Sequence, residues 1–295
     1  MASVKKVILF LMNYRGLAVL NGIIDAGYRE MIAGVITSAD IGMQHDYSVD
    51  IAELCNLNSI FVLEENEIGK FSDCIAILVG WRRIVKWGGQ SIVLHDSLLP
   101  SYSGFAPLVS AIKNKETSTG VTAFWAVDDY DRGDIISQLK LQISYPIKIQ
   151  SLIEQISPLY VKIACSILDK LKRNIQISAS PQDESKRTFS VWLDEEDYHI
   201  NWDVSAEEIL RKIDASGYPY LGAFSLCDNK KYRILSAVEI EDVCIENRTP
   251  GKVFAIRDNM PVVICKSGLL HCQEIIDDQS RTNVYSWRSL RVRFK

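Results

Sequence analysis

Residues 91–107 read SIVLHDSLLPSYSGFAP, and this stretch decides the fold. Its first four residues are mostly apolar and lead into His95, as expected of a buried strand that ends at a polar edge. Gly104 and Pro107 then shape the turn into the next helix. Open α/β sheets bind their ligands outside the carboxyl ends of the strands, so His95 is predicted to lie at a ligand edge.

On both sides of this stretch, apolar strand-like runs alternate with helical patterns. The predicted strands are residues 4–12, 31–37, 59–63, 74–79, 91–95, 120–127 and 134–143. The predicted helices are residues 17–25, 49–57, 104–113 and 149–173. This alternation is typical of an α/β protein with a mainly parallel sheet. The first strand runs into Asn13 without a GxGxxG motif, so the sequence does not support NAD binding.

The chain changes character after residue 173. Residues 174–187 are mainly polar and lack periodicity, which predicts a domain linker. Ser205 and Glu208 fit a capping box that opens a helix over 205–215. Short strands are predicted at residues 251–257, 261–266 and 268–275, as in a small β-barrel or open sheet. We therefore expect an α/β Rossmann-like domain over 1–186 and a C-terminal domain over 187–295.

Composition indicates an ordinary globular protein without a nucleic-acid partner. The 295 residues are 47% hydrophobic, and the net charge of −4 disfavours a polyanionic ligand. The seven cysteines form no CxxC, and the histidines show no ligand spacing, so we expect reduced thiols and no metal. The apolar run 7–12 is too short to span a membrane. A cytoplasmic location is therefore expected.

His95 has a candidate partner 36 residues further along the chain. Asp131 follows another predicted strand, so the two loops can meet across one cleft, where the carboxylate would orient the imidazole. Asp128, Asp129 and Asp134 are rivals for this role. The spacing favours Asp131, with Asp134 as the second choice.

These motifs together carry a family resemblance. The stretch from His95 to Pro107, the TGVT of residues 119–122 and the DRGD of residues 131–134 resemble the folate-dependent formyltransferases. That family includes methionyl-tRNA formyltransferase and the nucleotide-sugar N-formyltransferases. The resemblance covers most of the chain, and implies a Rossmann-like catalytic domain followed by a small OB-like domain.

The resemblance also implies a reaction. A substrate amine would attack the formyl carbon of 10-formyltetrahydrofolate directly, and the resulting oxyanion would need stabilisation. His95 would be the catalytic histidine that holds this charge or shuttles the proton. Asp131 would be the catalytic aspartate that keeps His95 aligned.

The remaining site residues follow from the same resemblance. The expected folate contacts lie in two loops: Gly80, Trp81, Arg82, Arg83, Val127, Asp129 and Tyr130. The expected acceptor contacts are Asn13, Tyr14, Arg15, Asp96, Ser97, Tyr102, Tyr218, Tyr220 and Phe224. Each set has an ordinary structural alternative: Trp81 as core or rim packing, residues 13–15 as a polar turn, and the three later aromatics as interdomain core.

Three positions depart from the family pattern. Val93 stands where the family usually has an asparagine that polarises the formyl oxygen, and losing such a donor typically costs ~10²–10³ in rate. Either another group supplies it, the site works differently, or the protein is inactive. Asp96 adds a carboxylate that either pairs with Arg82 or Arg83 or contacts the substrate amine. Ser103 replaces a common arginine, which weakens any local phosphate contact.

The resemblance is strongest to the bacterial nucleotide-sugar N-formyltransferases, in particular the pseudaminic-acid type. It implies a homodimer that formylates a UDP-linked 4-amino-4,6-dideoxy-N-acetyl-altrosamine for a cell-surface polysaccharide. Methionyl-tRNA formyltransferase is the enzymatic alternative, but residues 178–186 hold only one lysine and make a poor phosphate-binding strip. The basic C-terminus, 288–295, alternates with apolar residues and is interpreted as an edge strand. A folate- or sugar-nucleotide-binding protein without catalysis is the third hypothesis, because of Val93.

Overall fold

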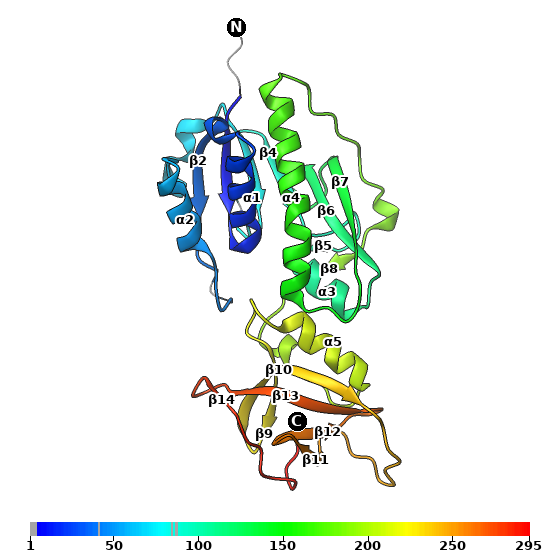
Figure 1. Cartoon of the computed structure of the whole chain (residues 1–295). Helices are drawn as coiled ribbons and strands as arrows, with labels where there is room; N and C mark the ends of the chain where they lie inside the picture. Colours follow the sequence, from blue (N-terminus) through cyan, green and yellow to red (C-terminus); the bar gives the residue numbers. More distant parts are fainter. Residues whose placement is uncertain (1–4, 41, 84, 86–87) are drawn as a thin grey trace. The chain divides into compact units, whose positions relative to one another are not determined.

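The computed structural model describes residues 5–40, 42–83, 85 and 88–295, and Figure 1 traces the chain. The chain divides into two compact units. The first consists of Met1–Leu108, Thr117–Ser144 and Ser151–Val191, and the second of Val109–Glu116, Tyr145–Gln150 and Trp192–Lys295. The chain thus passes into its second unit for the last time after Val191, slightly beyond the predicted boundary.

The first unit is built on a mixed six-stranded sheet. Its spatial order is β2 (Ile32–Thr37), β1 (Val7–Leu11), β3 (Ile75–Val79), β4 (Ser91–His95), β6 (Ser118–Trp125) and β7 (Ile135–Gln142). The first four strands run parallel, and β6 and β7 pair antiparallel. All residues of β1 and β3 are buried, as expected of apolar strands covered on both faces. The α/β fold with a mixed sheet is therefore confirmed.

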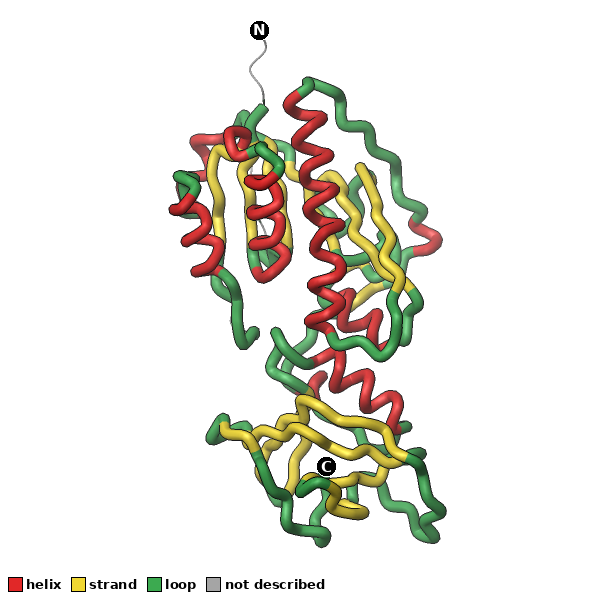
Figure 2. The backbone as a smooth tube through the Cα atoms, viewed as in Figure 1, coloured by secondary structure: helices red, strands yellow, loops and turns green. Residues whose placement is uncertain are grey.

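Helices α1 (Asn13–Asp25), α2 (Ser48–Leu57) and most of α4 (Ile149–Lys172) belong to the same unit as this sheet, with the short turns η1 (Arg29–Met31) and η2 (Glu65–Phe71). Helix α3 (Pro107–Lys113) lies mostly in the second unit. Figure 2 shows α1 and α4 on the same face of the sheet. They approach closely at Gly22, where an added Cβ would lie 2.3 Å from Val161. By length and composition α4 could span a membrane, but half of its apolar stretch is buried, as in a core helix.

The second unit is built on an antiparallel sheet. The strand order is β11 (Val253–Arg257), β12 (Met260–Ile264), β13 (Leu269–Asp277), β10 (Lys230–Ile240) and β9 (Ala223–Cys227), with β14 (Thr282–Asn283) beside β13. Helix α5 (Ala206–Ser216) begins with the predicted capping box between Ser205 and Glu208. Its apolar side contributes Ile209 and Ile213 to the core of this unit.

The C-terminal residues do not form the predicted edge strand. Only Arg293 and Phe294 make bridges: Arg293 to Lys252, which precedes β11, and Phe294 to Cys227, the last residue of β9. These residues therefore link the open edges of the sheet and draw it towards a barrel. Phe294 is buried against Trp202 and Trp287, so its alternation with arginines reflects a core contact.

Two other segments differ from their predicted structure. Residues 59–63, expected to be a strand, make a single parallel bridge between Val62 and Val35. Residues 174–187, expected to be a linker, belong to the first unit, where Ser180 exchanges two backbone hydrogen bonds with Ile135 at the start of β7. Polar composition alone did not reveal this pairing. The segment continues through η3 (Glu184–Lys186) into β8 (Phe189–Ser190), which pairs with β5 (Ser103–Gly104).

Candidate active site

His95 is the last residue of β4 and is only 9% exposed. Its Nε2 lies 2.9 Å from the carbonyl oxygen of Tyr102, which can only accept a hydrogen bond. Nε2 must therefore carry the ring proton. In the neutral ring this leaves Nδ1 as the free base, facing the Asp131 carboxylate at 3.8 Å. This distance is too long for a direct hydrogen bond but lies within the range of an ion pair.

Asp131 lies in the loop between β6 and β7, and its side chain is largely buried. Its Oδ2 accepts a 2.6 Å hydrogen bond from the backbone amide of Gly104. The Asp131 backbone adopts a φ of 54°, a left-handed conformation that aspartate tolerates better than most residues. Asp134, the second choice, is exposed. The structure thus brings Asp131 to His95, and the amide of Gly104 is committed to the carboxylate.

Arg187 binds the backbone of the Asp131 loop. The sequence did not identify this residue as part of the site. Its guanidinium, 3% exposed, donates to the backbone oxygen of Asp131 at 3.3 Å and to Ser103 Oγ. It also donates to Gln182 and Glu184. The hydrogen bond with Glu184 raises the pKa of Arg187, and the nearby Asp131 carboxylate acts in the same direction. This residue sat in the supposed linker, where no pattern marked it as buried.

The Thr122 hydroxyl explains part of the TGVT motif. It donates to the carbonyl of Ser97 at 2.6 Å and accepts from the amide of Leu99 at 3.1 Å. Gln138 of β7 adds hydrogen bonds to Thr122 and to the carbonyl of Leu99. Strands β6 and β7 therefore fix the loop that follows His95. The Ser97 hydroxyl, predicted to contact the acceptor, is buried and donates to the carbonyl of Ser101.

A buried ion pair crosses the carboxyl edge of the sheet. Arg15, near the start of α1, pairs with Asp96, which follows β4. Arg15 Nε also donates to Asn13 Oδ1 at 3.1 Å. Gly80, after β3, lies beneath this bridge, since an added Cβ would lie 2.4 Å from Asn13 Nδ2. Asp96 therefore pairs with Arg15, and the expected pairing with Arg82 or Arg83 is wrong.

The other predicted acceptor residues are divided between the two units. Tyr14 packs its ring edge-on against Tyr47 at 5.6 Å, near the same edge of the sheet. Tyr102 contributes its backbone oxygen to His95. Tyr218, Tyr220 and Phe224 belong to the second unit. Tyr220 and Phe224 are each 7% exposed, and Phe224 stacks on His199 at 4.9 Å, as expected of core aromatics.

The predicted folate loops differ in exposure. Val127, Asp129 and Tyr130 are exposed, whereas Trp81 packs edge-on against Phe10 at 5.1 Å. The Trp81 Nε1 is buried and has no hydrogen-bond partner among the described residues. Arg82 pairs with Asp40 at 3.0 Å, and Arg83 pairs with Glu65 at 3.4 Å.

Val93 precedes His95 by two residues in β4, so the two side chains point to the same side of the strand. It packs against an apolar cluster that includes Phe10, Ala76 and Leu78. Its side chain cannot donate a hydrogen bond to a reacting oxygen. Within the described residues, no group of three or more histidine, cysteine or acidic side chains could hold a metal ion.

The fold defines a class of two-part α/β proteins: a mixed sheet that carries a histidine–aspartate pair at the carboxyl end of β4, and an antiparallel unit that follows it along the chain. Two family models match this chain: "Formyl transferase" over residues 72–163 and "Formyl transferase, C-terminal domain" over residues 193–289. The chain belongs to the formyl transferase family.

Individual relatives show the same kinship. A methionyl-tRNA formyltransferase of Fervidobacterium nodosum is 32% identical over 207 residues, which cover 68% of this chain and 65% of that protein. An N-formyltransferase from Helicobacter canadensis, solved with folinic acid and dTDP-3-aminofucose, matches with a TM-score of 0.68 at 18% identity, covering 91% of this chain and 99% of that one. HypX from Aquifex aeolicus, solved with tetrahydrofolic acid, matches with a TM-score of 0.67 at 18% identity, and the match covers 94% of this chain and 45% of that one. At these identities the solved structures establish the fold.

Proposed function

We propose that this protein is an N-formyltransferase. It transfers a formyl group from 10-formyltetrahydrofolate to the amino group of a nucleotide-linked amino-deoxy sugar. The observation that carries the proposal is the convergence of His95 Nδ1 and Asp131 Oδ2 at 3.8 Å, beside the carboxyl edge of the sheet. Family membership supports the reaction type.

His95 acts as the base in this proposal. The carbonyl of Tyr102 keeps the proton on Nε2, so Nδ1 can take the proton that the substrate amine loses during attack. The resulting imidazolium lies beside the Asp131 carboxylate, which stabilises its charge. Because the Gly104 amide binds Asp131, it does not serve the oxygen on which negative charge develops.

The residues around this pair suit a folate donor, which supplies an activated formyl carbon when bound. Val127 and Tyr130 expose apolar surface for a flat ring, and Asp129 beside them offers a carboxylate for ring N–H groups. The buried Trp81 Nε1 is a further donor awaiting an acceptor among the described residues. These residues would hold the donor, while Arg82 and Arg83, each in an ion pair, shape its rim.

The acceptor would lie on the α1 side of the same edge. Asn13, Arg15 and Asp96 form a rigid polar bridge there. The N-formyltransferase from Helicobacter canadensis matches this chain over nearly its whole length and was solved with a dTDP-linked amino sugar. This likeness supports a nucleotide-sugar acceptor. Our finer proposal is that the acceptor is UDP-4-amino-4,6-dideoxy-N-acetyl-altrosamine. The protein would then act as a cytoplasmic homodimer in the pseudaminic-acid pathway, which supplies cell-surface polysaccharide.

A panel of acceptors tests this proposal. The protein is incubated with 10-formyltetrahydrofolate and UDP-, GDP- or dTDP-linked amino sugars, and formylated product is measured by mass spectrometry. Formylation of one nucleotide sugar, with none of initiator methionyl-tRNA, is the expected result. Formylation of the tRNA alone would overturn the sugar assignment.

Methionyl-tRNA formyltransferase is the second candidate, favoured by the curated relative from Fervidobacterium nodosum. A tRNA acceptor needs cations free to bind phosphates. In the segment 178–187, however, Lys186 pairs with Asp183 at 3.0 Å and Arg187 pairs with Glu184. Arg132 nearby is also paired with Glu184. These ion pairs favour the sugar acceptor.

A binding protein without catalysis is the third candidate, favoured by Val93. The apolar packing of Val93 removes the expected amide donor from the site. Tight binding of a folate analogue with no formylated product from any acceptor would support this candidate. Turnover that depends on His95 would exclude it.

A further inference from the structure

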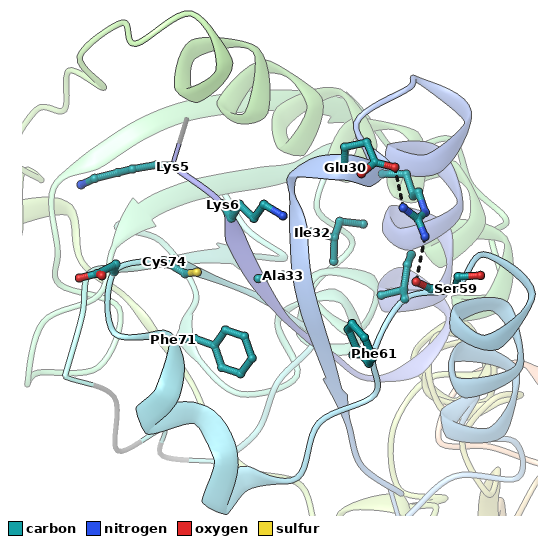
Figure 3. A pocket seen from close by; sticks show the side chains of 12 residues that line it. Lys5, Lys6, Glu30, Ile32, Ala33, Ser59, Phe61, Phe71 and Cys74 are labelled. Carbon is teal, nitrogen blue, oxygen red and sulfur yellow. Dashed lines mark hydrogen bonds and ion pairs between the residues drawn. The ribbon is translucent and has the colours of Figure 1, made fainter. Parts of the chain in front are cut away.

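A cavity of about 540 Å³ lies at the amino ends of β2, β1 and β3. Figure 3 shows it from close by. Its walls come from the residues before β1, from η1 and the start of β2, from the loop after α2, and from the end of η2. His95 ends β4 at its carboxyl edge, so the cavity lies at the other end of the strands from the proposed active site.

The cavity has an apolar floor and wall. Ile32 and Ile60 are buried, and in Figure 3 Phe71 and Phe61 stand on either side of Ala33. Phe61 is 74% exposed, although its backbone is fixed by a 2.8 Å hydrogen bond from Val35 to its carbonyl. An exposed aromatic ring on a fixed backbone at the mouth of a cavity is a ready contact for a flat apolar group.

The opposite wall is cationic. Lys5 and Lys6 precede β1, and neither ammonium has an ion-pair partner among the described residues. Arg29 is held in place by the carbonyls of Asn58 at 2.8 Å and Ser59 at 2.9 Å, and by Glu30. The three bonded N–H groups leave two of its five donors for another acceptor. Asp73 is the other carboxylate at the wall.

We propose that this cavity is a second ligand site, which binds a small anion with a flat apolar body, such as an aromatic carboxylate. The aromatic part lies against Ala33 between Phe61 and Phe71, and the carboxylate meets Lys6. Lys5, whose side chain points away from the rings in Figure 3, adds positive charge at the rim. The volume suits such a molecule, since small-molecule pockets span roughly 300–1,000 Å³. The site is separate from the formyl-transfer machinery, so it stands or falls independently of that activity.

Cys74 provides a reporter inside the cavity. Burial raises the pKa of the Cys74 thiol, Asp73 raises it further and Lys6 lowers it, so its thiolate lies within the field of the lysine. The probe is dithiobis(nitrobenzoate), an aromatic disulfide with two carboxylates, compared with the neutral aromatic dithiodipyridine. Each transfers an aromatic thiol to the cysteine and releases the other half as a thiolate. The exposed Cys244 of the second unit serves as the internal control.

We expect Cys74 to prefer the dianionic reagent over the neutral one by about 10-fold or more relative to Cys244, as measured by peptide mapping of the modified thiols. The double substitution K5Q/K6Q should remove this preference, and Phe61→Ala should slow both reagents at Cys74. Free nitrobenzoate should protect Cys74 but not Cys244.

The matched controls are Lys230→Gln, an exposed lysine of the second unit, and Phe254→Ala, a partly exposed phenylalanine there. Both should leave the Cys74 preference unchanged. An equal reagent preference at Cys74 and Cys244, or a preference that survives K5Q/K6Q, would overturn the proposal. Circular dichroism of each variant separates these outcomes from unfolding.

Discussion

The buried guanidinium of Arg187 donates a hydrogen bond to the backbone oxygen of Asp131, 56 residues earlier in the chain. The same guanidinium binds Ser103, whose neighbour Gly104 donates to the Asp131 carboxylate. One arginine thus fixes both sides of the contact that holds Asp131 near His95.

Replacing Arg187 should therefore impair positioning more than binding. We expect Arg187→Lys to lower kcat by about 10-fold or more, because lysine cannot bridge these acceptors at once. The KM for the formyl donor should change little. Arg173→Lys, an exposed arginine paired with Asp169, is the matched control and should leave both constants unchanged. A rise in KM of about 10-fold with an unchanged kcat in Arg187→Lys would show that Arg187 binds substrate instead.

Gly80→Ala tests the polar bridge at the carboxyl edge. Gly80 has a φ of 62°, and its new Cβ would lie 2.4 Å from Asn13 Nδ2. Gly27 has a φ of 77° but open space around it, so Gly27→Ala isolates the backbone penalty of about 1–2 kcal/mol. Urea unfolding should show Gly80→Ala to be the more destabilising. Equal losses of stability would mean that Asn13 moves aside freely.

The pair between Arg15 and Asp96 is buried on both sides. Asp96→Leu removes the carboxylate that faces the buried Arg15 cation, which should lower the free energy of unfolding by about 3–5 kcal/mol. The double variant R15M/D96L removes both charges and should recover much of that loss. Denaturant unfolding of the wild type, both single variants and the double variant measures the coupling. Additive losses would indicate that the two side chains do not interact in solution.

Asp214 of α5 gives a pH dependence. Burial raises the pKa of Asp214 from 3.8 to about 6, with Lys148 opposing the shift. Between about pH 4 and pH 6 the folded protein therefore binds more protons than the unfolded chain, whose aspartate has a pKa of about 3.9. This group's contribution to stability is present below pH 4 and is lost as the pH rises through 6.

Asp214→Asn removes that contribution. The stability of the variant relative to wild type should rise by about 1–2 kcal/mol between pH 4 and pH 7, allowing for partial solvent screening. The control is Glu207→Gln, which removes an exposed carboxylate of the same helix that pairs with Lys115. A difference that stays constant with pH would show that folding leaves the pKa of Asp214 unchanged, and a difference that falls would show that folding lowers it; either outcome contradicts the prediction.

The sequence predicted the sheet because apolar runs mark the strands. Strand ends alone do not explain the approach of Asp131 to His95, since β6 runs antiparallel to β4 and Trp125, at the carboxyl end of β6, pairs with Ile92 near the start of β4. The family resemblance is what favoured this pairing.

The sequence could not predict Arg187, since a buried arginine in a polar segment looks like any solvated one. It also offered Arg82 and Arg83 as ion-pair partners of Asp96, because Arg15 is 81 residues away and the choice depends on strand order. The alternation of arginines with apolar residues over 288–295 led to the incorrect prediction of an edge strand for a similar reason. Phe294 packs into a core that forms only in the folded sheet.

The joint action of His95 and Asp131 is measured most directly by single-turnover formyl transfer in the wild type, His95→Gln, Asp131→Asn and the double variant. If the two residues act as one unit, each single variant should lose at least about 10²-fold, and the double variant should be no slower than His95→Gln. Losses that multiply in the double variant, or a His95→Gln rate equal to that of the wild type, would contradict the pairing.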